Sequence, residues 1–270
     1  MSFLEALFLG LVEGVTEFLP ISSTGHLLLA QRGLGIERGE AADAWSICVQ
    51  SGAIVAVLAL YPARCKQVLR GLLGKDPAGR SLGLALFLAF LPAAALGLLA
   101  KDAIRERLFG LTPVAWAWLV GGFLLLAFAK RMRPAAGGRE ISTLSLGGAL
   151  GIGLLQCAAF WPGTSRSLVT ILGGVLVGLS VASAVEFSFL LGLVTLVAAS
   201  AYEGWAAREA LIGAYSPGVM LTGFVAAFAS AALSMRWLVS WVRERGLEIF
   251  GWYRVALGLG VLVWLEVSGE

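Results

Sequence analysis

An apolar stretch at residues 3–34 is broken in its middle by the polar sequence PISSTGH, at residues 20–26. Each half is about a dozen residues long, which is shorter than the roughly 20 residues that a spanning helix needs. Proline, glycine and hydroxyl residues at membrane depth free backbone polar groups, and these are tolerated where the segment is buried in protein or lines a wet cavity. The pattern predicts a re-entrant helix–loop–helix hairpin.

A second apolar stretch, at residues 144–179, is interrupted in the same way by WPGTSRS at residues 161–167. We therefore expect a second hairpin there. The remaining apolar runs are unbroken, and each is close to the length of a membrane span. They lie at residues 44–61, 81–100, 111–129, 184–202, 212–233 and 250–265.

The composition places the chain among the polytopic membrane proteins. It is 59% hydrophobic and 14% charged, whereas a soluble domain carries about 25% charged residues. The formal charge of +3 comes with no basic stripe suited to nucleic acid. Cys48, Cys65 and Cys157 have no metal-ligand spacing and are interpreted as apolar fillers. Acidic residues interrupt the first apolar run, which argues against a signal peptide.

The order of the predicted elements is hairpin, three spans, hairpin, three spans, which indicates an internal repeat. The sequence GLVE at residues 10–13 matches GLLQ at residues 153–156, and FLP at 18–20 matches FWP at 160–162 with one residue of slippage. Because three spans are an odd number, the second copy is predicted to be inverted. We therefore expect one all-α membrane domain over residues 1–270, with inverted repeats at 1–130 and 140–270.

The charged connections predict an orientation in the membrane. The rule that cation-rich loops stay inside places three of them in the cytoplasm, and they carry Arg64, Lys66, Arg70, Lys75 and Arg80; Lys130, Arg131, Arg133 and Arg139; and Arg236, Arg243 and Arg245. The acidic connector with Glu37, Glu40 and Asp43 and the one at 203–209 are predicted outside. Both termini and the opening of the first hairpin then lie on the outer side. A loop predicted at 101–107 is the exception, because Lys101, Arg105 and Arg107 are placed outside.

Glu13 and Glu17 lie four residues apart, on one face of a helix. Carboxylates inside a membrane segment are costly and therefore suggest function. The pair suits a hard divalent cation such as Mg²⁺ or Ca²⁺, which would bridge to phosphate oxygens. The pair could also supply a general base. The structural alternative is that this helix lies at the membrane interface, with both glutamates in contact with water.

The polar loop that follows offers nucleophiles and phosphate ligands. Ser22, Ser23 and Thr24 could attack phosphorus, bind phosphate or simply cap the next half-helix. His26, the single histidine, could act as general acid, general base or nucleophile. A structural role is the alternative for His26.

Arg166 lies in the second polar loop, and an arginine at membrane depth needs an anionic partner. Its planar fork suits phosphate oxygens; the alternative is a salt bridge to Glu13, Glu17 or Glu186. An anion-binding nest around it would include Gly163, Thr164, Ser165 and Ser167. Gln50 and Glu186 could each hold a ligand-binding side chain in place, or serve as polar groups in helix packing.

These residues resemble a known family. EGVTEFLPISSTGH at residues 13–26 resembles the signature of the bacterial undecaprenyl-diphosphate phosphatases, the bacitracin-resistance family. PGTSRS at 162–167 with Thr170, EFSFLL at 186–191, and Tyr253-Arg254 also match. Leu168 stands where the family usually has a glycine, and Val194 stands where it often has a proline. The shape of the second loop and one helix kink could therefore differ from those of the family.

The resemblance implies release of inorganic phosphate from undecaprenyl diphosphate, which recycles the lipid carrier for cell-wall synthesis in the bacterial cytoplasmic membrane. It also implies dependence on a divalent cation and a homodimer. By motif position it points to Glu13, Glu17, Ser23, His26, Arg166 and Thr170. The nucleophile stays open among Ser23, His26 and water.

A transporter that flips a polyprenyl phosphate lipid is the competing function, and the inverted repeat favours it. A carboxylate and a histidine beside a serine are more chemistry than a carrier requires. We therefore expect an enzyme.

Overall fold

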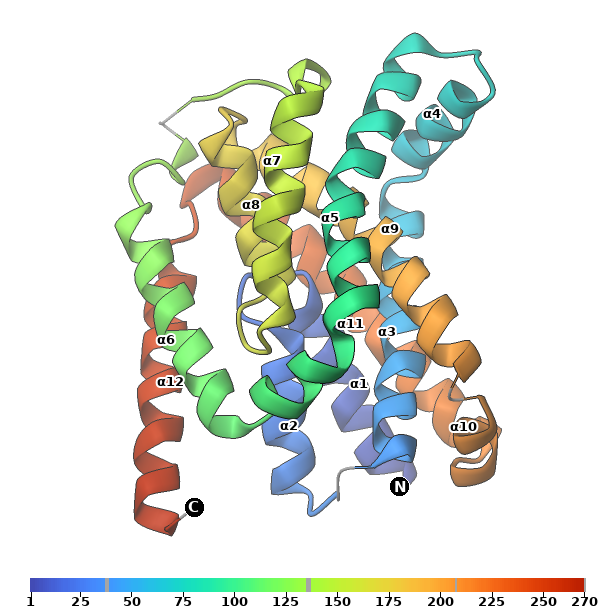
Figure 1. Ribbon diagram of the computed structural model, residues 1–270, viewed down its shortest axis with the longest axis vertical. Coiled ribbons are helices and arrows are strands. Elements are labelled where there is room, and N and C mark those ends of the chain that lie inside the picture. Colours follow the sequence, from blue (N-terminus) through green and yellow to red (C-terminus); the bar gives the residue numbers. More distant parts are fainter. Residues whose placement is uncertain (37–38, 135–136, 207, 270) are drawn as a thin grey trace.

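The computed structural model describes residues 1–36, 39–134, 137–206 and 208–269, and within these ranges the chain is helical without a β-strand (Figure 1). The predictions for the side chains of Glu37, Arg38, Glu40, Asp43, Cys48, Lys101 and Arg105 lie outside what is described. The first half contains α1 (Phe3–Glu17), α2 (Ser23–Gly33), α3 (Glu40–Leu60), α4 (Pro62–Leu72), α5 (Pro77–Leu108) and α6 (Leu111–Ala127). The second contains α7 (Leu146–Gln156), α8 (Arg166–Leu176), α9 (Val181–Ala206), α10 (Arg208–Ala214), α11 (Pro217–Glu244) and α12 (Glu248–Ser268).

The two helix breaks predicted from the sequence are confirmed. A loop at residues 18–22 separates α1 from α2, and a loop at 161–165 separates α8 from a short 3-10 helix, Cys157–Phe160, that extends α7. The second helix of each pair begins at a serine cap: Ser22 Oγ accepts from the Gly25 N–H at 3.4 Å, and Ser165 Oγ accepts from the Leu168 N–H at 3.2 Å. The break is thus shorter than PISSTGH, because its last four residues already belong to α2.

Four helices are long and apolar enough to cross a membrane: α5 over Pro77–Ala100, α9, α11 and α12. The run predicted at 44–61 forms α3, which joins α4 at an 84° bend and would count as a fifth span with it. Pro62 at the start of α4 explains the bend, because it lacks an N–H and can only begin a helix. The run predicted at 111–129 forms α6, which is apolar but only 17 residues long.

Three segments predicted as connections between spans are largely helical. The 101–107 segment belongs to α5, which ends at Leu108. The loop with Arg64, Lys66 and Arg70 contains α4. The span predicted at 212–233 corresponds to α11, which continues to Glu244. Arg236 and Arg243, predicted in the connection after that span, therefore lie inside a helix. Lysine and arginine are good helix formers, so helical hydrogen bonding continues where the apolar run ends.

The first helix of each pair packs on a long helix from the other half of the chain. Helix α1 lies along α11, where Ser230 Oγ donates to the Gly10 carbonyl at 3.5 Å and Ser234 Oγ donates to the Gly14 carbonyl at 3.0 Å. Helix α7 lies along α5, and Gly153 is in close contact with Ala89. Helices α6 and α12 run side by side at one edge (Figure 1). This reciprocal packing brings the two loops to the middle of the molecule.

The close approach of α1 to α11 depends on Gly14, because a β-carbon there would overlap Ser230 Oγ and Ala227 O. We expect Gly14→Ala to destabilise the protein by about 1–3 kcal/mol, the usual cost of overpacking. Thermal unfolding in detergent, followed by tryptophan fluorescence, measures this. The control is Gly33→Ala at the end of α2, which has no neighbouring atom within 4 Å. Equal melting temperatures for the two variants would contradict the packing argument.

Candidate active site

The two loops touch each other through backbone carbonyls. Ser167 Oγ, at the start of α8, donates to the Leu19 carbonyl at 2.7 Å, and Ser165 Oγ lies 3.5 Å from the same oxygen. Trp118 of α6 donates from its indole N–H to the Ile21 carbonyl at 2.8 Å. The polar residues that the sequence places about 140 positions apart therefore form one cluster.

A carboxylate lies at the centre of this cluster. Glu17 Oε2 accepts a hydrogen bond of 2.5 Å from Ser23 Oγ, and Glu17 Oε1 forms an ion pair of 2.9 Å with Arg166 Nη2. The side chains of Glu17 and Arg166 are only 6% and 11% exposed. A hydroxyl bonded to a buried carboxylate is arranged to lose its proton, and a guanidinium beside it suits a phosphate oxygen.

The second half of the chain holds Arg166 in place. Its Nη1 donates to the Ser188 carbonyl at 3.0 Å, and Ser188 Oγ lies 2.7 Å from Thr170 Oγ1. Gly192 leaves the space that the guanidinium occupies. Of the salt bridges that the sequence allowed for Arg166, the one to Glu17 is present. The alternative salt bridge to Glu186 is wrong.

Glu186 instead forms an ion pair of 2.6 Å with Arg64 of α4. It therefore lies outside the cluster around Glu17. Glu186 begins the EFSFLL stretch at 186–191, and the residue of that stretch that supports Arg166 is Ser188.

A cavity of about 110 Å³ opens beside this centre. Its predicted site residues are Glu17, Ser22, Ser23, Thr24, Gly163, Ser165 and Arg166, and its other lining residues are Gln50, Ala159, Pro162 and Leu196. Pockets that hold drug-sized molecules measure about 300–1,000 Å³. This cavity is therefore of a size for a phosphate group and not for a prenyl chain.

Five predicted site residues do not line the cavity: Glu13, His26, Thr164, Ser167 and Thr170. His26 is held on both sides, since Nδ1 is 2.6 Å from the Ser22 carbonyl and Nε2 is 2.7 Å from the Tyr253 hydroxyl. A carbonyl oxygen can only accept, so Nδ1 carries a proton. His26 thus contacts the site through Ser22.

Glu13 is 1% exposed, and its Oε1 has no hydrogen-bond partner. A buried carboxylate oxygen without a partner is costly unless a cation satisfies it. Glu17 follows one turn later on α1. The described part of the chain has no cluster of three His, Cys, Asp or Glu side chains, but Mg²⁺ commonly binds through one or two carboxylates with water and phosphate oxygens. The residues present fit such a cation.

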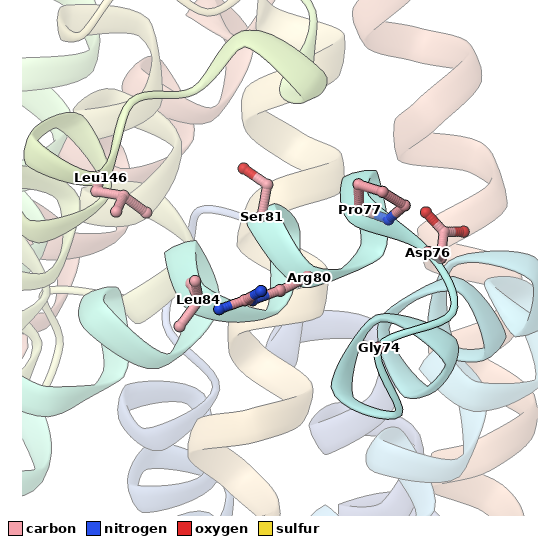
Figure 2. Close-up of a pocket in the computed structure, with 7 residues that line it drawn as sticks. All are labelled: Gly74, Asp76, Pro77, Arg80, Ser81, Leu84 and Leu146. Carbon is pink, nitrogen blue, oxygen red and sulfur yellow. The ribbon is translucent and has the colours of Figure 1, made fainter.

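Two larger cavities are lined by other residues. One of about 290 Å³ lies where α5 begins, and Figure 2 shows Asp76, Arg80 and Ser81 there with Leu146 of α7 across from them. Asp76 serves as the N-cap of α5, since its Oδ1 accepts from the Gly79 N–H at 2.9 Å. The other, of about 380 Å³, lies between α2 and the start of α6. Cavity size therefore does not identify the site.

The sequence alone assigned no site role to Ser188, Gly192 and Arg254. It did not decide between a role in the site and a role in helix packing for Gln50. Gln50 is a polar residue inside an apolar span, and that signal was visible. Ser188 lies in the EFSFLL stretch, but only the folded chain shows that its backbone oxygen binds Arg166. Arg254 is completely buried in α12; a charged residue inside an apolar run was the available signal.

Comparison with known proteins identifies the family of this chain. The family model described as bacitracin resistance protein BacA matches residues 6–260. An undecaprenyl-diphosphatase of Sorangium cellulosum is 45% identical, over 98% of this chain and 87% of the relative. Undecaprenyl-diphosphatase 2 of Rhodospirillum rubrum is 46% identical, over 96% and 93%, and an undecaprenyl-diphosphatase of Cereibacter sphaeroides is 43% identical, over 94% of each chain. The chain therefore belongs to the bacitracin resistance protein BacA family.

Proposed function

We propose that this chain is an integral membrane phosphatase that hydrolyses undecaprenyl diphosphate to undecaprenyl phosphate and inorganic phosphate, and so recycles the lipid carrier for cell-wall synthesis. The observation that carries the proposal is the buried Glu17 carboxylate between the Ser23 hydroxyl and the Arg166 guanidinium, beside a phosphate-sized cavity. Relatives that share more than 40% of their residues with the chain are named for this activity.

The geometry favours Ser23 as the nucleophile. Its oxygen attacks the terminal phosphorus while Glu17 takes its proton, and the bond from that phosphorus to the bridging oxygen breaks to leave undecaprenyl phosphate. Arg166 neutralises charge on the phosphoryl oxygens. Water then hydrolyses the phosphoserine and returns Ser23 to its free state.

The remaining predicted residues bind the phosphate group or hold the site residues in place. Ser22, Thr24, Gly163 and Ser165 line the cavity, and helices α2 and α8 begin there with N–H groups that suit phosphate. Thr164 and Ser167 belong to the same nest, and Thr170 acts through Ser188. His26 acts through the Ser22 carbonyl. Glu13 and Glu17 would hold Mg²⁺ or Ca²⁺, which would supply positive charge to the phosphate oxygens.

The architecture is proposed to be two inverted repeats, at residues 1–130 and 140–270, each with a re-entrant hairpin. Matching features support this. Ser22 and Ser165 both have φ of 75°, and Gly10 and Gly153 both approach a backbone carbonyl of the long helix beside them. We place the protein in the bacterial cytoplasmic membrane as a homodimer, with the site open to the outer side.

A transporter of a polyprenyl phosphate lipid is the second candidate, because the reciprocal packing of α1 on α11 and of α7 on α5 resembles transporter architecture. Detergent-solubilised protein separates the two functions. The enzyme releases inorganic phosphate from undecaprenyl diphosphate in detergent, whereas a pure carrier releases none.

Glu17→Gln keeps the size of the side chain but removes its charge. We expect kcat to fall by about 100- to 10,000-fold, the usual contribution of a general base. Phosphate release from purified protein, with and without EDTA, measures this and the cation requirement together. Glu5→Gln, on the exposed start of the same helix, is the control and should leave kcat unchanged. Full wild-type activity in EDTA would disprove the metal role of Glu13 and Glu17.

Arg166→Lys keeps a positive charge but loses the planar fork. We expect kcat/KM to fall by about 100-fold, a loss typical for one donor to transition-state charge. Arg64→Lys weakens the ion pair with Glu186 outside the cavity and should keep kcat/KM near the wild-type value. Near-normal kinetics of Arg166→Lys would show that Arg166 only pairs with Glu17.

The orientation can be tested with single cysteines at Gly39 and Gly74 in a cysteine-free background. Both positions are exposed. Because Gly39 adjoins the acidic connector and Gly74 follows the cationic α4, a membrane-impermeant maleimide should label Gly39→Cys in intact cells and spare Gly74→Cys. The reverse pattern would place the opening of the site in the cytoplasm.

A further inference from the structure

Arg254 of α12 is fully buried and bonds to backbone carbonyls from three elements. Its Nη1 donates to the Pro20 carbonyl at 3.2 Å. Its Nη2 donates to the Gly163 carbonyl at 2.9 Å and to the Ala117 carbonyl of α6 at 2.8 Å. One guanidinium therefore joins the loop before α2, the loop before α8 and the helix beside them.

The two loop carbonyls occupy matching positions. Pro20 lies two residues before Ser22, and Gly163 lies two residues before Ser165. These serines are the two non-glycine residues with positive φ in the described ranges, and both begin the helix that carries site residues. Ser23 follows the first serine and Arg166 follows the second. Arg254 thus connects the two backbones close to the residues that meet at Glu17.

Holding a guanidinium in this place is costly. A buried charge is destabilising unless it is paired or fully hydrogen-bonded, and the partners of Arg254 in the described chain are neutral carbonyls. Helix α6 accommodates it through Gly121, where any β-carbon would overlap Nη2. If the contact between the two loops were needed only for stability, a neutral or apolar side chain could make it. A planar fork, in contrast, sets the distance between two backbones.

We propose that Arg254 is a positioning residue for phosphate release: it fixes the spacing of the two loops and thereby the placement of Ser23 against Arg166. The inference rests on the proposed phosphatase function. Arg254 is not among the residues that line the cavity. Its contribution is geometric, and a misplacement of about 1 Å at a reacting group can cost about 100-fold in rate.

The first test is Arg254→Lys, which keeps the charge and loses the fork. We expect kcat per folded, monodisperse protein to fall by about 100-fold, with KM changed less than kcat. Arg133→Lys is the matched control, because Arg133 pairs with Glu248 at the exposed end of the same helix. If folded Arg254→Lys protein keeps the wild-type kcat, the positioning role is wrong.

The second test is Gly121→Ala, which leaves Arg254 intact and pushes its guanidinium away from α6. We expect the same fall in kcat, and the double variant should lose little more than either single one, because both act on one contact. Additive losses would overturn the proposal. Loss of folded protein in these variants, with the wild-type kcat in the folded fraction, would also overturn it.

A structural readout separates this inference from the function on which it rests. Cysteines at Ser22 and Thr164, in a cysteine-free background, report loop spacing through the yield of a short crosslinker, whatever the activity. We expect Arg254→Lys and Gly121→Ala to lower that yield, and Arg133→Lys to leave it unchanged. An unchanged yield in the first two variants disproves the spacing role, whereas absent phosphate release from wild-type protein disproves the phosphatase alone.

Discussion

The molecule depends on one buried interaction, the Glu17 carboxylate bonded to Ser23 and to Arg166. A carboxylate and a guanidinium are each costly in an apolar interior, and together they are tolerated only if their hydrogen bonds are made. Because the two residues come from helix pairs 149 positions apart, the chain must bring two loops to one point. The arrangement of the long helices can be understood as the solution to that constraint.

Small residues make the meeting of the loops possible. Gly10 and Gly14 let α1 approach α11, and Gly153 lets α7 approach α5. Gly121 and Gly192 then leave room for the guanidinium groups of Arg254 and Arg166. In a lipid environment close backbone contact replaces much of the hydrophobic driving force, so such glycines have a structural role. The cavity beside Glu17 and Arg166 in this tightly packed centre measures about 110 Å³.

Several features of the fold could be predicted from the sequence alone, and the errors in the predicted helix ends have clear physical causes. The helix breaks were visible because proline, glycine and hydroxyl residues interrupt apolar runs. The long helices were visible too, but their ends were not. Hydropathy reports where lipid-compatible residues stop, whereas a helix continues until a cap or proline ends it. Helix α11 therefore extends past Arg236 and Arg243, and the segment at 101–107 continues α5.

The sequence by itself determined the class of protein, the two broken helices and most residues at the centre, because composition, periodicity and local capping depend on neighbours along the chain. The family resemblance also lay in the local motifs, and the comparisons agree with it. Only the tertiary structure decided which anion pairs with Arg166, which residues line the cavity, and that His26 and Arg254 bond to backbone carbonyls. Those facts depend on the angles and distances between packed helices, and no spacing along a single helix encodes them.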